Sequence, residues 1–173
     1  MELAIKKILY ATDLSKNSAH AFQYAIDYAE KHDAQIIILY IYEKLPWADM
    51  TELEDNLQIA EQLKFAVKNK ENTINNIKKR LSDFCKKEKA KKDDPSCTFR
   101  ADTIEVCEGY PANTILEKAD EFDCDLIVMG THGKGRISHA FLGSVAEKVL
   151  RRSSRPVLTI PLPEGHTDLT FED

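Results

Sequence analysis

The sequence predicts an α/β domain built on an open, five-stranded parallel sheet with helices on both faces. Short apolar runs alternate with segments of helical periodicity, in the order β-α-β-α-β-α-β-α-β. The run at Gln35–Tyr42 is apolar along almost its whole length, as is typical of strands buried on both sides of a parallel sheet. With 173 residues, the chain is expected to form one domain with right-handed crossovers between its strands.

The start of the chain predicts a strand followed by a helix. Lys7–Tyr10, with the apolar Ala11 after it, has the composition of a buried strand. Apolar residues then recur at helical spacing between residues 19 and 29, and Ser15, Asn17 or Ser18 could cap this helix. Gln35–Tyr42 predicts the second strand.

A long helical region is expected over about residues 51–92, where apolar residues recur three, four or seven positions apart. The run Lys68–Thr73 carries no apolar residue and is a candidate break. As one helix, the region would be on the order of 60 Å long, which exceeds the width of a small domain. We therefore expect either a break or a projecting end.

The second half of the chain predicts three further strands and two helices. Pro is favoured in the first turn of a helix, and cations are favoured in the last. Residues 1–162 are expected to form the domain, and 163–173 an acidic and loose tail. The expected segments are a strand at Asp102–Cys107, a helix from Gly109–Pro111 onward, a strand at Asp125–Met129, a loop at Gly130–Gly143, a helix at Ser144–Arg152 and a strand at Arg155–Pro161.

The composition of the chain argues against several classes of function. The net charge is −5, from 24 Lys and Arg against 29 Asp and Glu, which argues against a nucleic-acid partner. No run approaches the roughly 20 apolar residues of a membrane span, and the first residues do not resemble a secretory signal. None of the four cysteines forms a C-x-x-C pair, which favours free thiols in the cytoplasm, although a Cys85–Cys97 disulfide remains open.

A glycine loop and a helix start predict a site for a polyphosphate. Gly130 directly follows the fourth strand, Gly133 comes three residues later, and Gly143–Ser144 opens the next helix. Glycine lets backbone N–H groups approach a ligand, and a helix start offers unpaired N–H groups to phosphate. The loop is not a Walker A motif, because Gly133–Lys134 is followed by Gly135. It is not a dinucleotide fingerprint either, because that motif belongs after the first strand.

The spacing Gly130-x-x-Gly133, nine residues and then Gly143–Ser144 resembles the nucleotide-binding signature of the universal stress protein family, and its ATP-binding subgroup in particular. The opening KKILYATDLSKNS, the segment DLIVMGTHG and the ending GSVAEKVLRRSSRPVLTIP are also similar to that family. The resemblance implies the adenine nucleotide alpha-hydrolase-like fold, with a parallel sheet of strand order 3-2-1-4-5.

The resemblance also implies which residues bind the nucleotide. Asp13, at the end of the first strand after Ala11 and Thr12, matches the residue that binds the ribose and adenosine end. Ile41 matches the residue whose backbone meets adenine. Asp13 could instead cap the first helix, Ser144 could be only a helix-start residue, and His132 could be only a loop histidine. The remaining matching residues are Met129, Gly130, His132 and Gly133 around the ribose and phosphates, and Gly143, Ser144 and Val145 at the outer phosphates.

By resemblance, we expect a stress-response or signalling module that binds ATP, or ADP or AMP, with Mg or Mn held through the phosphates. It would act as a homodimer through the fifth strand, at Pro156–Ile160, with a protein partner that the sequence does not name. No catalytic residue and no metal-ligating side chain is predicted. The alternatives are a slow ATPase or phosphotransferase, and an interaction module that binds no nucleotide.

Overall fold

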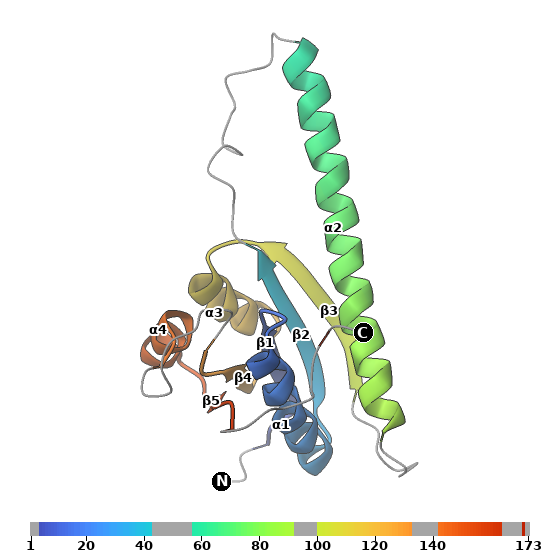
Figure 1. The fold of residues 1–173 in the computed structure, drawn as a ribbon. Coiled ribbons are helices and arrows are strands. Elements are labelled where there is room, and N and C mark those ends of the chain that lie inside the picture. The colour runs from blue at the N-terminus through green and yellow to red at the C-terminus, as the bar shows by residue number, and fades with distance from the viewer. Residues whose placement is uncertain (1–3, 43–56, 92–99, 133–141, 164–170, 172–173) are drawn as a thin grey trace.

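The structure is a computed structural model, and it describes residues 4–42, 57–91, 100–132, 142–163 and 171. Its strands and helices follow the predicted order (Figure 1). The strands are β1 (Lys7–Thr12), β2 (Gln35–Tyr42), β3 (Arg100–Glu108), β4 (Leu126–Gly130) and β5 (Val157–Ile160). The helices are α1 (Lys16–His32), α2 (Leu57–Ala90), α3 (Pro111–Glu121) and α4 (Ser144–Arg152).

The strands form one parallel sheet in the order β3-β2-β1-β4-β5, which confirms the predicted fold class and strand order. Helices α1 and α2 cover one face, and α3 and α4 cover the other (Figure 1). Successive residues of β1 point to opposite faces, as strand geometry requires. Ile8 and Tyr10 therefore join the layer under α1 and α2, whereas Leu9 and Ala11 join the layer under α3 and α4.

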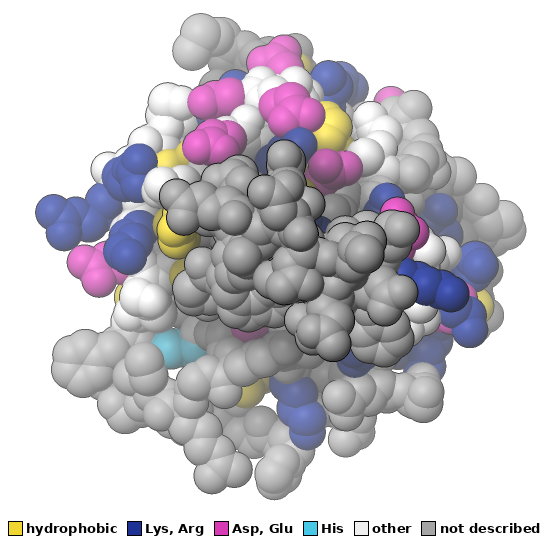
Figure 2. All heavy atoms as spheres, turned by 90° about the horizontal axis from the view of Figure 1, so that it is seen from above, with side chains coloured by type: hydrophobic (Ala, Val, Ile, Leu, Met, Phe, Trp, Pro, Cys, Tyr) yellow, Lys and Arg dark blue, Asp and Glu magenta, His cyan; other side chains and the backbone are white. Residues whose placement is uncertain are grey.

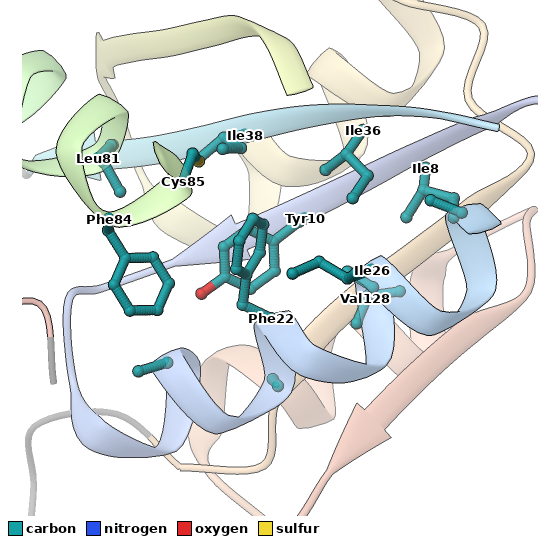
Figure 3. Packing of buried hydrophobic residues seen from close by; sticks show 14 of the residues in the cluster. Ile8, Tyr10, Phe22, Ile26, Ile36, Ile38, Leu81, Phe84, Cys85 and Val128 are labelled. Carbon is teal, nitrogen blue, oxygen red and sulfur yellow. The ribbon is translucent and has the colours of Figure 1, made fainter. Parts of the chain in front are cut away.

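The layer under α1 and α2 is rich in aromatic side chains. The ring of Tyr10 on β1 lies 4.8 Å from that of Phe22 on α1, and Phe22 lies 5.5 Å from Phe84 on α2 (Figure 3). The Tyr10 hydroxyl donates to the carbonyl of Ser18, so its polar end is satisfied inside the core. Burial raises the pKa of Tyr10 far above its usual value, and its phenol stays neutral at any physiological pH.

Helix α2 is continuous through Lys68–Thr73, so of the two expected outcomes, a break or a projecting end, the structure has the projecting end. The helix has 34 residues and is about 51 Å long, and its N-terminal part extends past the sheet (Figure 1). Lys70 explains the continuity. It lies four residues before Ile74 on the inward face, where its ammonium pairs with Glu108 and lies 5.5 Å from the centre of the Tyr42 ring.

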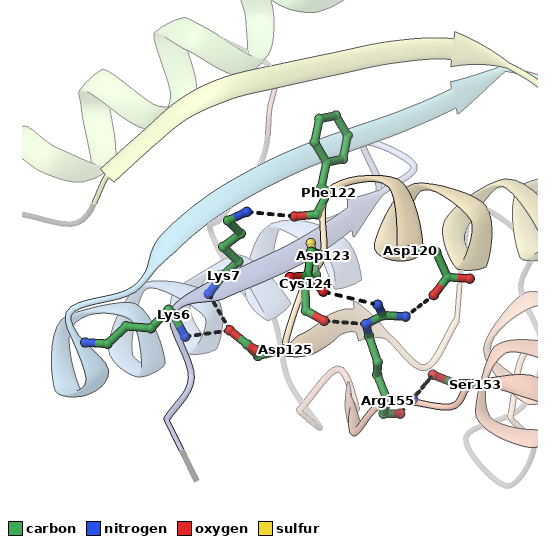
Figure 4. Close-up of polar contacts among 9 residues, drawn as sticks. All are labelled: Lys6, Lys7, Asp120, Phe122, Asp123, Cys124, Asp125, Ser153 and Arg155. Atoms are coloured by element: carbon green, nitrogen blue, oxygen red, sulfur yellow. Dashed lines mark hydrogen bonds and ion pairs between the residues drawn. The ribbon is translucent and has the colours of Figure 1, made fainter.

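At the amino ends of the strands, polar contacts join four segments of the chain (Figure 4). A side-chain oxygen of Asp125 accepts hydrogen bonds from the backbone amides of Lys6 and Lys7, at 2.7 and 2.9 Å. The guanidinium of Arg155 donates to the carbonyl of Cys124 and to the carboxylate of Asp120. These contacts join β1, α3, the turn before β4 and the start of β5, at the edge of the sheet opposite the carboxyl ends of the strands.

Most of the tail lies outside the described residues, so the prediction that it is loose stays a prediction. Of its two described residues, Pro163 is exposed, whereas Phe171 is 7% exposed and packs against Phe84. Cys85, Cys107 and Cys124 are free thiols, and Cys97 is outside the described residues. The structure therefore contains no Cys85–Cys97 disulfide.

Candidate functional site

A cavity of about 290 Å³ opens at the carboxyl ends of β1 and β4. These two strands are neighbours at the centre of the sheet, but β1 leads toward β2 on one side and β4 leads toward β5 on the other. Open parallel sheets bind ligands at this kind of reversal point. The cavity is lined by Ala11, Thr12, Asp13, Ser18, Leu39, Ile41, Pro111, Ile115, Met129, Gly130, Thr131, His132, Gly143, Ser144, Val145 and Ala146.

The end of β1 places a carboxylate at this cavity. Asp13 accepts a hydrogen bond of 3.0 Å from the amide of Ser15, and Ser15 itself is the N-cap of α1. Asp13 is therefore not the helix cap. Between them, Leu14 has a φ of 62°, a left-handed conformation that a side chain of this size rarely adopts. This turn leaves Asp13 half-buried at the cavity with one of its oxygens directed to the backbone.

Gly130 is required by the packing of α1 against the end of β4. A Cβ added at Gly130 would lie 2.9 Å from the carboxamide carbon of Asn17. Asn17 is 4% exposed, and its Nδ2 donates to the carbonyl of His132 at 3.0 Å. The sequence argument assigned Gly130 to the ligand, and the structure adds that its missing side chain makes room for Asn17.

Gly143 has a similar role at the start of α4. Its amide donates to the carbonyl of Thr131 at 2.8 Å, and an added Cβ would lie 2.8 Å from the same oxygen. As the N-cap residue, Gly143 supplies no side chain to the helix start. The first turn of α4, Ser144–Ala146, therefore lines the cavity without a side-chain cap, and its N–H groups have no partner within the helix.

The opposite part of the cavity is apolar. Leu39 and Ile41 point to the same face of β2, Ile115 comes from α3, and Met129 comes from β4. The ring of His132 is held at the rim, because its Nδ1 lies 2.9 Å from the hydroxyl of Thr131. The lining thus contains apolar side chains suited to a flat apolar group and helix N–H groups suited to an anion.

The structure brings together every predicted site residue except Gly133, which lies outside the described residues. The others all line the same cavity. The sequence argument missed Leu39, although strand periodicity places it two residues before Ile41 on the same face. It also missed Ser18 and Ala146, which follow from the helix starts, and Pro111, Ile115 and Thr131.

No group of three or more His, Cys, Asp or Glu side chains that could hold a metal ion occurs in the part of the chain that is described. Within the same ranges, no helix is both long and apolar enough to cross a membrane.

Figure 2 looks onto the molecule from above the projecting end of α2, and it shows described acidic side chains gathered on one side of this end. An anion would therefore depend on local backbone donors, since the net charge is −5.

These features define an α/β domain of the doubly wound class with a crevice at its reversal point. More specifically, the chain belongs to the universal stress protein family, whose model matches residues 4–161. It is 32% identical to universal stress protein MJ0531 of Methanocaldococcus jannaschii over 159 residues, covering 92% of this chain and 84% of that protein. It is 30% identical to MJ0577 of the same organism over 164 residues, covering 92% and 97%.

Solved structures of this family have the same fold. The structure of MJ0577 superposes with a TM-score of 0.64 at 27% identity, covering 94% of this chain and 99% of that one. A universal stress protein in complex with cAMP gives a TM-score of 0.51 at 26% identity, covering 91% and 98%.

Proposed function

We propose that the chain is an adenine-nucleotide-binding universal stress protein of the cytoplasm, with ATP as its ligand. The observation that carries the proposal is the first turn of α4, which lines the cavity at Ser144–Ala146 and has no side-chain cap. Helix N-termini favour phosphate, because their N–H groups lack partners and carry partial positive charge. These unpaired N–H groups can bind an anion locally, although the net charge of the chain is negative.

The rest of the nucleotide fits the remaining walls. Leu39, Ile41 and Ile115 offer an apolar surface to adenine, and the carboxylate of Asp13 can accept hydrogen bonds from ribose hydroxyls. The relative solved with cAMP supports an adenine nucleotide as the class of ligand. ATP, rather than ADP or AMP, is proposed because the spacing of Gly130, Gly143 and Ser144 resembles the signature of the family's ATP-binding subgroup.

A Mg or Mn ion would be bound through the phosphates, where it offsets their negative charge. The residues that face the nucleotide provide binding and orientation. Gly133, which the resemblance places at the phosphates, lies outside the described residues and stays part of the proposal.

We also propose that the protein acts as a homodimer through β5. This strand is an edge of the sheet, pairing with β4 on one side. Exposed edges invite pairing with a second chain, and a two-fold axis would cover both copies. Sedimentation velocity at micromolar protein concentrations should show a dimer. A monomer at all of these concentrations would refute this part of the proposal.

Calorimetry with ATP and magnesium tests the nucleotide site. Wild type should give saturable heat, and Ser144→Glu should give none, because its carboxylate would meet the phosphates. The same substitution should not weaken folding, since an acidic side chain in the first turn complements the helix dipole. The matched control is Ser154→Glu, an exposed position after the far end of α4. Equal heats for wild type and Ser144→Glu would contradict the proposal, as would no heat for wild type.

A further inference from the structure

The layer between α1, α2 and the sheet contains a residue from the far end of the chain. Phe171 is 7% exposed, and the centre of its ring lies 4.3 Å from that of Phe84 on α2. Through Phe84, it continues the row of aromatic rings that reaches Phe22 and Tyr10. We call the place between α1 and α2 that holds the ring of Phe171 the aromatic seat.

The aromatic seat is separate from the nucleotide cavity. None of Phe22, Phe84 and Phe171 lines that cavity. The seat is formed by the layer that α1 and α2 share, and the cavity opens at the strand ends instead. Nucleotide binding therefore does not account for it.

The α2 surface next to the seat is basic. Arg80 and Lys87 lie four residues before and three residues after Phe84, so they share its side of the helix, and both are exposed. Between Ile77 and Lys91, the exposed charged side chains are basic at seven positions and acidic at one, Asp83. This surplus contrasts with the net charge of −5 for the whole chain.

The segment that supplies the aromatic ring is acidic. In the sequence, Asp168 precedes Phe171, and Glu172 and Asp173 follow it. The side chain in the seat is therefore an aromatic one whose neighbours in the sequence are acidic. The basic exposed side of α2 complements that composition.

We propose that the aromatic seat is a docking site for a short acidic segment of a partner protein that presents one large aromatic side chain. Phe171 is the intramolecular competitor for this site. A tethered segment has a high effective concentration, so a partner must displace it or add contacts along the basic side of α2. A nucleic acid or an anionic lipid surface offers negative charge, but it offers no aromatic side chain positioned to replace Phe171.

Fluorescence anisotropy with a labelled peptide of residues 163–173 tests the site. The Phe171→Ala chain should bind this peptide at least tenfold more tightly than wild type does, because the seat no longer holds its own ring. A peptide with alanine in place of its phenylalanine should not bind. Adding Arg80→Glu and Lys87→Glu to the Phe171→Ala chain should weaken binding by about tenfold. The control Lys148→Glu, at an exposed position on α4, should leave it unchanged.

Circular dichroism melts check that each variant folds. If Phe171→Ala does not fold, Phe171→Leu retains most of the apolar bulk and should bind the peptide with intermediate affinity. Equal peptide binding by wild type and variant would overturn the proposal. Equal binding of the peptide with alanine in place of its phenylalanine would overturn the proposal too. So would binding of an oligonucleotide or of anionic vesicles as tight as that of the peptide. A dimer that is lost in Phe171→Ala would assign the seat to a second copy's tail and would also overturn it.

Discussion

Asn17 donates a hydrogen bond of 3.0 Å from its Nδ2 to the carbonyl of His132, which joins the first turn of α1 to the segment that follows β4. The same nitrogen lies 3.4 Å from the hydroxyl of Thr131. Both Thr131 and His132 line the cavity, whereas Asn17 does not. Asn17 is therefore a positioning residue, since it acts on the cavity through the backbone that it holds.

Replacing Asn17 with alanine should loosen this rim of the cavity. Asn17→Ala leaves the carbonyl of His132 without this donor and should lower the free energy of unfolding by about 1–3 kcal/mol. Affinity for ATP should fall as well, because the residues at the end of β4 are no longer fixed. Urea denaturation and calorimetry measure the two effects. Asn75→Ala, at an exposed position on α2, is the matched control, and an equal effect there would contradict this role.

Gly130 and Asn17 should be energetically coupled. Gly130→Ala places a methyl group 2.9–3.1 Å from the carboxamide of Asn17 and should cost about 1–3 kcal/mol of stability. In an Asn17→Ala background the methyl group has room, so the same change should cost much less. A double-mutant cycle by urea denaturation gives the coupling energy. Additive costs would show that the glycine is needed for another reason.

Much of the fold could be predicted from the sequence, because each element carries its own local pattern. The strand at Gln35–Tyr42 and the helix at Ser144–Arg152 have the predicted bounds. The site could be located as well, since parallel strands bring Asp13 and Gly130 to the same edge of the sheet. The physical role of Gly130 could not be predicted, because it depends on contact with Asn17, more than a hundred positions away in the sequence.

The sequence analysis left the continuity of α2 open for a similar reason. A run without apolar residues predicts a break only if no polar side chain can be accommodated on the side of the helix that faces the sheet. Lys70 stands there because Glu108 and Tyr42, both from the strands that α2 crosses, supply its partners. These partners become visible only in three dimensions.

Removing Lys70 should therefore weaken the junction between α2 and the strand ends. Lys70→Ala should lower stability by about 1 kcal/mol, because the side chain is half-exposed and solvent screens its pair with Glu108. Lys68→Ala, an exposed position two residues earlier, should have little effect. Urea denaturation at low and high salt measures both. A cost at Lys70 that is independent of salt would mean that packing of its stem, rather than charge, holds the helix.

The buried thiol of Cys85 should make the protein less stable in alkali. Burial raises the pKa of Cys85 to about 12, whereas an unfolded cysteine ionises near pH 8.5. Above that pH the unfolded chain loses a proton that the folded chain keeps, so the free energy of unfolding falls as pH rises toward 12. Below about pH 8 the thiol is protonated in both the folded and the unfolded state. It therefore adds no pH dependence to the free energy of unfolding in that range.

The size of this effect can be isolated with Cys85→Ala. By pH 10, ionisation of Cys85 in the unfolded state should cost wild type about 1–2 kcal/mol. Cys124, whose pKa burial raises to about 11, contributes in both proteins, as do the lysines and tyrosines, so their effects cancel in the comparison. Urea denaturation at pH 7.5 and 10 should show a loss smaller by about that amount in Cys85→Ala. Equal losses in the two proteins would mean that the thiol reaches solvent before the chain unfolds.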